Sequence, residues 1–166
     1  MRDGVRVMIR PIRPDDEPLI VKFHEPLSER SVYFYFFSPM KLSQRISHER
    51  LTRICFLDYD RQISLVADYK DPQNGEHKIL GVGRLIKQHG RNEAEFAMIV
   101  SDAYQMKGLG VELLRRLVQI GRNEKLQRIT ADILPDNRAM QRVCEKLGFK
   151  LRRSADDPMI KASIDL

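Results

Sequence analysis

The sequence predicts a single α+β domain built around a mostly antiparallel sheet. Three consecutive segments, 63–69, 78–87 and 93–100, show the two-residue alternation of strands. The turn sequences between them are short enough to force antiparallel neighbours. Segments with helical spacing precede and follow this meander. A chain of 166 residues is long enough to bury roughly 70% of its unfolded surface in one core, so we expect one domain over residues 1–166.

The first third of the chain predicts one strand followed by short helices. Residues 5–12 place apolar side chains on one face at period two, as a half-buried strand requires. The aspartates at 15–16 can cap the helix that follows. Ser28 is the start signal of a second helix, and Ser43 is expected to cap a third helix that runs to about Phe56.

The last third predicts a long helix and then alternating elements. Residues 109–122 place leucines at helical spacing with charged side chains on the opposite face, which is typical of an amphipathic helix. The remaining expected elements are a strand at 129–134, a helix opened by 135–137 and closed by Gly148, and short strands near 149–153 and 159–165.

Composition excludes several classes of protein. The longest apolar runs, such as 79–83, fall far short of the ~20 residues that a membrane span needs. Cys55 and Cys144 are 89 positions apart and the four histidines are scattered, so we expect neither a disulfide nor a metal site. The first residues do not resemble a secretory signal, and a cytoplasmic location is therefore expected.

Positive charge is concentrated in one segment. The formal net charge is +6, and residues 105–153 hold 12 Lys and Arg against 5 Asp and Glu. Such a segment favours a nucleic acid, an acidic protein surface or a phosphorylated small ligand as partner, and charge alone does not separate these three.

A glycine-containing turn joins the strand at 93–100 to the amphipathic helix. Gly108 and Gly110 let backbone N–H groups approach an anion, and the helix N-terminus adds unpaired donors with about half a positive charge. The spacing fits neither a Rossmann fingerprint, because Leu113 stands at its third glycine, nor a P-loop. The same G-x-G spacing at 81–83 lies inside a strand, where close packing or a bulge is the expected role.

Two separated motifs resemble those of the GCN5-related N-acetyltransferase (GNAT) superfamily. Gln105-x-x-Gly108-x-Gly110 is similar to its acyl-CoA-binding motif, and residues 135–139 with 145–149 are similar to its second cofactor-side helix. The order of the elements extends this resemblance over nearly the whole chain. Within the superfamily, the opening at 10–17 and the segments 27–31 and 35–38 resemble bacterial protein lysine acetyltransferases of the Pat type.

This resemblance implies a three-layer α/β/α GNAT fold whose mixed, mostly antiparallel sheet is splayed between the fourth and fifth strands. It also implies that acetyl-CoA lies in the opening as co-substrate. The residues expected to bind it are Ile99, Val100, Gln105, Met106, Lys107, Gly108, Leu109, Gly110 and Asn137, and Arg138 and Arg142 are candidates to assist its phosphates.

The implied chemistry is direct attack of an amine on the thioester. A lysine amine with a pKa near 10.4 is neutral in only about one molecule in 2,500 at pH 7, so a base is needed. Glu95 matches the family position of the glutamate base, with Glu93 as the competing register. Backbone N–H of Ile99 or Val100 is the implied donor to the oxygen that becomes negative.

The implied proton donor departs from the family pattern. The CoA thiolate is usually protonated by a tyrosine, and Cys144 occupies the corresponding position here. A thiol can donate a proton, but a lone helical cysteine is more commonly a small buried hydrophobe. Water or Tyr104 are the alternative donors.

The resemblance therefore implies an acetyl-CoA-dependent N-acetyltransferase whose preferred acceptor is a protein lysine, such as one on an acyl-CoA synthetase. The alternatives are a small-molecule amine acceptor, a non-catalytic acyl-CoA-binding protein and a nucleic-acid-binding module. We do not expect nucleic acid, because the positive charges are interleaved with cofactor-turn and helix-core positions. The sequence allows a homodimer.

Overall fold

A seven-stranded sheet forms the centre of the computed structural model, which describes residues 6–36, 40–47, 55, 62–88, 90–105 and 107–166. Its strand order is β1-β2-β3-β4-β5-β7-β6, and every neighbouring pair is antiparallel except β4 and β5. The strands are β1 (Met8–Pro11), β2 (Gln62–Lys70), β3 (His77–Lys87), β4 (Glu93–Val100), β5 (Arg128–Ile133), β6 (Lys150–Ser154) and β7 (Asp157–Asp165). This arrangement confirms the mixed, mostly antiparallel sheet.

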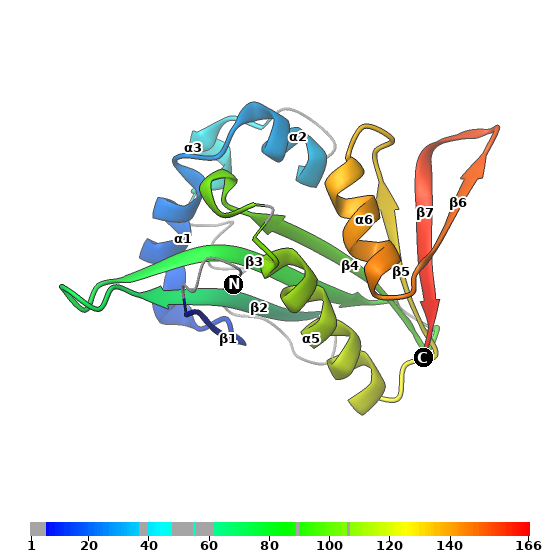
Figure 1. The fold of residues 1–166 in the computed structure, drawn as a ribbon, viewed down its shortest axis with the longest axis horizontal. Helices are drawn as coiled ribbons and strands as arrows, with labels where there is room; N and C mark the ends of the chain where they lie inside the picture. The colour runs from blue at the N-terminus through cyan, green and yellow to red at the C-terminus, as the bar shows by residue number, and fades with distance from the viewer. Residues whose placement is uncertain (1–5, 37–39, 48–54, 56–61, 89, 106) are drawn as a thin grey trace.

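Helices cover both faces of the sheet and make three layers (Figure 1). The α-helices whose bounds the structure describes are α1 (Glu17–His24), α2 (Glu29–Phe36), α3 (Leu42–Arg45), α5 (Leu109–Asn123) and α6 (Arg138–Lys146), with 3-10 turns η1 (Pro14–Asp16) and η2 (Asp102–Tyr104). Helices α5 and α6 lie on one face, and α1 to α3 lie on the other.

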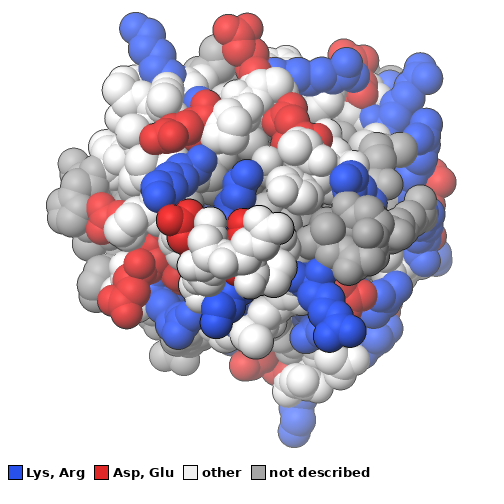
Figure 2. Space-filling model, turned by 60° about the vertical axis from the view of Figure 1, so that its left-hand side comes forward, with Lys and Arg blue, Asp and Glu red and all other residues white. Residues whose placement is uncertain are grey.

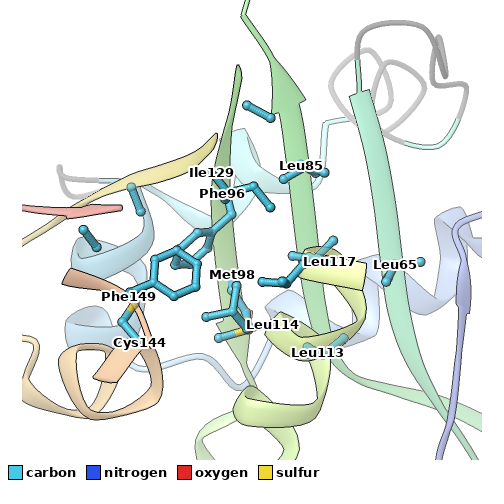
Figure 3. Packing of buried hydrophobic residues seen from close by; sticks show 14 of the residues in the cluster. Leu65, Leu85, Phe96, Met98, Leu113, Leu114, Leu117, Ile129, Cys144 and Phe149 are labelled. Carbon is cyan, nitrogen blue, oxygen red and sulfur yellow. The ribbon is translucent and has the colours of Figure 1, made fainter. Parts of the chain in front are cut away.

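The larger core lies between the sheet and helices α5 and α6 (Figure 3). Leu113, Leu114 and Leu117 are fully buried there because the 3.6-residue period brings them onto one side of α5. Phe96 of β4 meets Phe149 edge to face, with 5.5 Å between ring centroids. A smaller core on the opposite face packs α1 and α2 against the sheet.

Gly81 and Gly83 let α5 approach β3 closely. A Cβ atom on Gly81 would lie 3.0 Å from Cδ1 of Leu113, and one on Gly83 would lie 3.1 Å from Cδ1 of Leu117. Both distances are shorter than ordinary side-chain contacts. The close-packing role predicted for this glycine pair is confirmed.

Two predicted helix caps are wrong, and one is confirmed. The Ser28 hydroxyl accepts a hydrogen bond from the N–H of Ser31 and so caps α2 as predicted. Asp16 stands at the N-cap of α1 without capping it, because its carboxylate binds the Arg10 guanidinium instead. Helix α3 begins after Lys41 and ends at Arg45, so Ser43 lies inside it; most of the predicted continuation to residue 56 falls outside the described residues.

The close contact at β3 gives a stability prediction. Replacing Gly81 by Val should lower the free energy of unfolding by about 1–3 kcal/mol, because the added side chain overpacks against Leu113. Urea denaturation measures this change.

Gly110→Ala is a comparison at a glycine with less crowded surroundings. Its added Cβ would make contacts of 3.5 and 3.7 Å, which are ordinary packing distances. The free energy of unfolding should therefore stay within about 0.5 kcal/mol of the native value or rise. Equal destabilisation by both substitutions would contradict the packing assigned to Gly81.

Candidate active site

The sheet opens between β4 and β5 (Figure 1). These strands share only three register pairs, Glu93 with Arg128, Ala94 with Ile129 and Glu95 with Thr130. Beyond Glu95, β4 stays paired with β3 as far as Val100, while β5 stays paired with β7. The backbone groups that β4 and β5 would otherwise exchange are therefore available to a ligand in the opening.

A cleft of about 980 Å³ occupies this opening. Its size lies within the range of small-molecule sites, roughly 300–1,000 Å³. Walls come from β4, β5, α2, α6 and the N-terminus of α5. The predicted site residues that line it are Glu95, Ile99, Val100, Gln105, Gly108, Gly110 and Asn137.

The turn before α5 presents backbone N–H groups to the cleft. Gly108 has φ of +88°, a conformation that other residues adopt only with strain, and it forms the N-cap of α5. Gly108, Gly110 and Val111 line the cleft, and the first amides of a helix lack intrahelical partners. A Cβ on Gly110 would make ordinary contacts with Met98 and Val143, which line the cleft, and the helix N-terminus beside them favours a phosphate group.

Lys107 and Leu109, two described residues of the predicted turn, are not among the residues that line the cleft. The side chain of Leu109 is only 1% exposed and belongs to the core, which leaves its backbone N–H as the group for the predicted contact. Met106 lies outside the described residues. Val111 lines the cleft although the sequence motif gave no reason to include it.

The Gln105 side chain ties the turn to α2. Its Nε2 donates to the carbonyl oxygen of Val100 at 3.0 Å and to Oγ of Ser31 at 3.1 Å. The Ser31 hydroxyl donates to Asp102, which also accepts from the N–H of Ser28. Ser31 and Asp102 were missed by the sequence reasoning, because this contact joins segments 71 positions apart.

Glu95 lies at the point where β4 and β5 part. Its carboxyl is half-buried and faces the cleft, whereas Glu93 lies at the closed end, 3.6 Å from Arg128. Burial raises the pKa of Glu95, the nearby Asp132 carboxylate raises it further, and Lys161 acts in the opposite direction. A carboxyl group with a raised pKa is a stronger base than an exposed one.

Cys144 lies in the core and does not line the cleft. It is 0% exposed and packs in the same cluster as Phe149 (Figure 3). Burial raises the pKa of its thiol to about 12. The expected role as proton donor is therefore wrong. Tyr104 is also absent from the cleft lining, and its ring lies 5.6 Å from Nζ of Lys78 and 5.7 Å from Nζ of Lys107.

Helices α2 and α6 line the cleft with different kinds of side chain. From α2 come the aromatic side chains of Tyr33, Phe34 and Tyr35, and from α6 come the cations of Arg138, Arg142 and Lys146, spaced four residues apart. Oδ1 of Asn137 accepts from the N–H of Met140 and caps α6. The cleft thus combines an aromatic wall, a cationic wall and a carboxyl group.

Two features are absent from the described part of the chain. Its residues include no group of His, Cys, Asp and Glu that could hold a metal ion. They also contain no helix of the length and apolarity needed to cross a membrane.

Solved structures share this fold over nearly the whole chain. The GNAT domain of S. lividans PAT is 29% identical to this chain with a TM-score of 0.84, covering 99% of this chain and 93% of that one. Mycobacterium smegmatis RimJ in complex with CoA-disulfide has a TM-score of 0.69, covering 97% and 85% of the two chains; at 17% identity it shows the fold alone.

Curated sequences give the same family. An acetyltransferase of Pseudomonas aeruginosa is 30% identical over 155 residues, which are 93% of this chain and 81% of that protein. Acetyltransferase Pat of Mycolicibacterium smegmatis is 26% identical over 149 residues, 89% of this chain but only 42% of that protein. The family model described as an acetyltransferase (GNAT) domain matches residues 6–150. The chain therefore belongs to the GNAT family of acyl-CoA-dependent N-acetyltransferases.

Proposed function

We propose that this protein transfers the acetyl group of acetyl-CoA to the ε-amine of a protein lysine, with Glu95 as general base. One observation carries the proposal: a carboxyl group with a raised pKa lies where β4 and β5 part, facing a cleft bordered by free helix amides. The similarity to the GNAT domain of PAT supports a protein lysine as acceptor.

The cofactor side of the cleft fits the phosphates of CoA. The amides of Gly108, Gly110 and Val111 would hold the pyrophosphate, since a helix N-terminus favours an anion. Arg138 and Arg142 of α6 add positive charge along the same cleft. When bound, acetyl-CoA supplies a thioester whose carbonyl carbon accepts the amine and whose sulfur leaves.

Glu95 supplies the base that the acceptor needs. A lysine reaches the site as an ammonium ion, and it attacks only after losing a proton. The ionised Glu95 takes this proton, directly or through a water molecule. An N–C bond forms, the C–S bond breaks, and the products are an acetylated amine, CoA thiol and one proton.

Two other groups act on the carbonyl oxygen and the sulfur. Backbone N–H of Ile99 or Val100, both in the stretch of β4 that has no β5 partner, would donate to the oxygen as negative charge develops there. Since Cys144 lies in the core, water in the open cleft protonates the departing sulfur. A thiolate leaves readily because its conjugate acid has a pKa of about 8.5.

A nucleic-acid partner has weaker support. Several cations of the basic segment lie beside carboxylates: Arg115 and Arg116 contact Glu112, and Arg128 contacts Asp165. Acidic and basic side chains are interspersed on the face shown in Figure 2. A phosphate backbone binds best to a continuous surface of positive charge.

Removing the base tests the mechanism. Glu95→Gln should lower kcat by about 10²–10⁴-fold, because the amide cannot accept the proton, and should leave CoA affinity unchanged. Turnover is measured with a lysine acceptor such as an acyl-CoA synthetase, with modified lysines mapped by mass. Glu93→Gln, on the same face at the closed end, should keep native turnover. Native turnover in Glu95→Gln would remove Glu95 from the mechanism.

The cationic wall of α6 gives a binding prediction. Replacing Arg138 and Arg142 together by Gln should weaken CoA binding by roughly tenfold, since each exposed charge contact contributes up to about 1 kcal/mol. Calorimetry at two salt concentrations should show a smaller loss at high salt.

Arg115 and Arg116 provide the charge-matched control. They lie exposed on α5, and neither lines the cleft. Replacing both by Gln removes the same amount of charge and should leave CoA affinity within about twofold. An equal loss in both double variants would mean that overall charge, and not the α6 wall, attracts CoA.

A further inference from the structure

We propose that Asp132, held by Lys161, is the second carboxylate of the acceptor site and selects an acceptor that arrives as a cation. This inference rests on the proposed lysine acetylation and names a residue that recognises the lysine ammonium group. Asp132 and Glu95 would then have different tasks: Asp132 binds the positive charge, and Glu95 removes the proton.

The sheet brings Asp132 to the same side as Glu95. On β5, Ile129, Ala131 and Ile133 point into the core under α5 and α6, so Thr130 and Asp132 point to the other side. Glu95 pairs with Thr130, and Asp132 follows two residues later, where the strands have parted. Both carboxylates line the cleft from opposite sides of the opening.

Lys161 fixes Asp132 from the neighbouring strand. The two residues are direct partners in the β5–β7 register, and Nζ of Lys161 hydrogen-bonds to Oδ1 of Asp132. Nζ also lies 3.6 Å from Oδ2 of Asp157. The side chains of Lys161 and Asp132 are 54% and 33% exposed, and ion pairs with this exposure contribute only about 0–1 kcal/mol to folding. Each partner can therefore be replaced without loss of the fold.

Other charged groups surround this part of the cleft on the same face. Besides Asp132 and Lys161, Glu95 shares its face with Glu93 and Arg128 at the closed end, and Arg84 of β3 lies over the Tyr35 ring of α2 at 5.8 Å. Asp132 and Lys161 are the two charges that shift the pKa of Glu95, Asp132 upward and Lys161 downward.

This arrangement suits an ammonium group on an apolar stem. The aromatic wall formed by Tyr33, Phe34 and Tyr35 can pack against the methylene groups of a lysine. The ammonium group then lies near the carboxylates of Glu95 and Asp132, and Asp132 also forms an ion pair with Lys161. Glu95, which is half-buried and has the raised pKa, takes the proton.

The first test measures Glu95 in the protein without substrate. Its side-chain carboxyl is followed by ¹³C NMR against pH and assigned from the signal lost in Glu95→Gln. The titration midpoint should move to lower pH in Asp132→Asn, because a negative neighbour is removed. It should move to higher pH in Lys161→Met, because a positive neighbour is removed, and Lys161→Arg should restore the native midpoint.

A neighbouring ion pair provides the matched control. Arg128 and Asp165 are also direct partners of β5 and β7, with 2.9 Å between Nε and Oδ1, but lie at the closed end of the opening. Asp165→Asn should leave the Glu95 midpoint unchanged. Unmoved midpoints in Asp132→Asn and Lys161→Met, or shifts in the same direction, would overturn the proposal.

The second test measures acceptor choice. Asp132→Asn should raise KM for a lysine peptide by roughly fivefold and leave KM for acetyl-CoA unchanged. An arylamine acceptor, which is neutral at the assay pH, should show no change in KM. Equal changes for both acceptors would overturn the role of Asp132 in selecting a cation. Failure of the wild-type protein to acetylate any lysine would instead refute the proposed function, whereas the NMR titrations need no turnover.

Discussion

The separation of β4 from β5 after three paired residues is the constraint on which the site depends. Each strand pairs along its length with its other neighbour, β4 with β3 and β5 with β7. The strands β1 to β4 therefore diverge from the strands β5 to β7, and the cleft forms between these two parts of the sheet. Glu95 is the last shared position, so the carboxyl group lies where the opening begins.

Hydrogen bonds connect helix α2 to the segment before α5, on the other side of the cleft. Gln105 and Asp102 belong to the segment that presents the helix amides, and both bond to Ser31 of α2, which carries the aromatic wall. The turn and the wall therefore hold their positions relative to each other through side-chain hydrogen bonds. A shift of α2 would disturb the amides that face the cofactor, and the reverse holds as well.

Most of the fold could be predicted from the sequence because its elements depend on local patterns. Strand alternation, the leucine spacing of α5, the Ser28 cap and the glycine turns are all readable over a few residues. Cys144 was misassigned because its role depends on which side of α6 meets the core. The Asp132–Lys161 pair and the Gln105–Ser31 contact could not be foreseen, since they join residues 29 and 74 positions apart.

The most direct test of this account is a titration of ¹⁵N-labelled protein with CoA, followed through its backbone amide shifts. Binding in the opening predicts the largest changes at Gly108, Gly110 and Val111, with further changes along the end of β4 that has no β5 partner. Small or absent changes there, with the largest ones at the distant turn between β2 and β3, would contradict the assignment of the cleft.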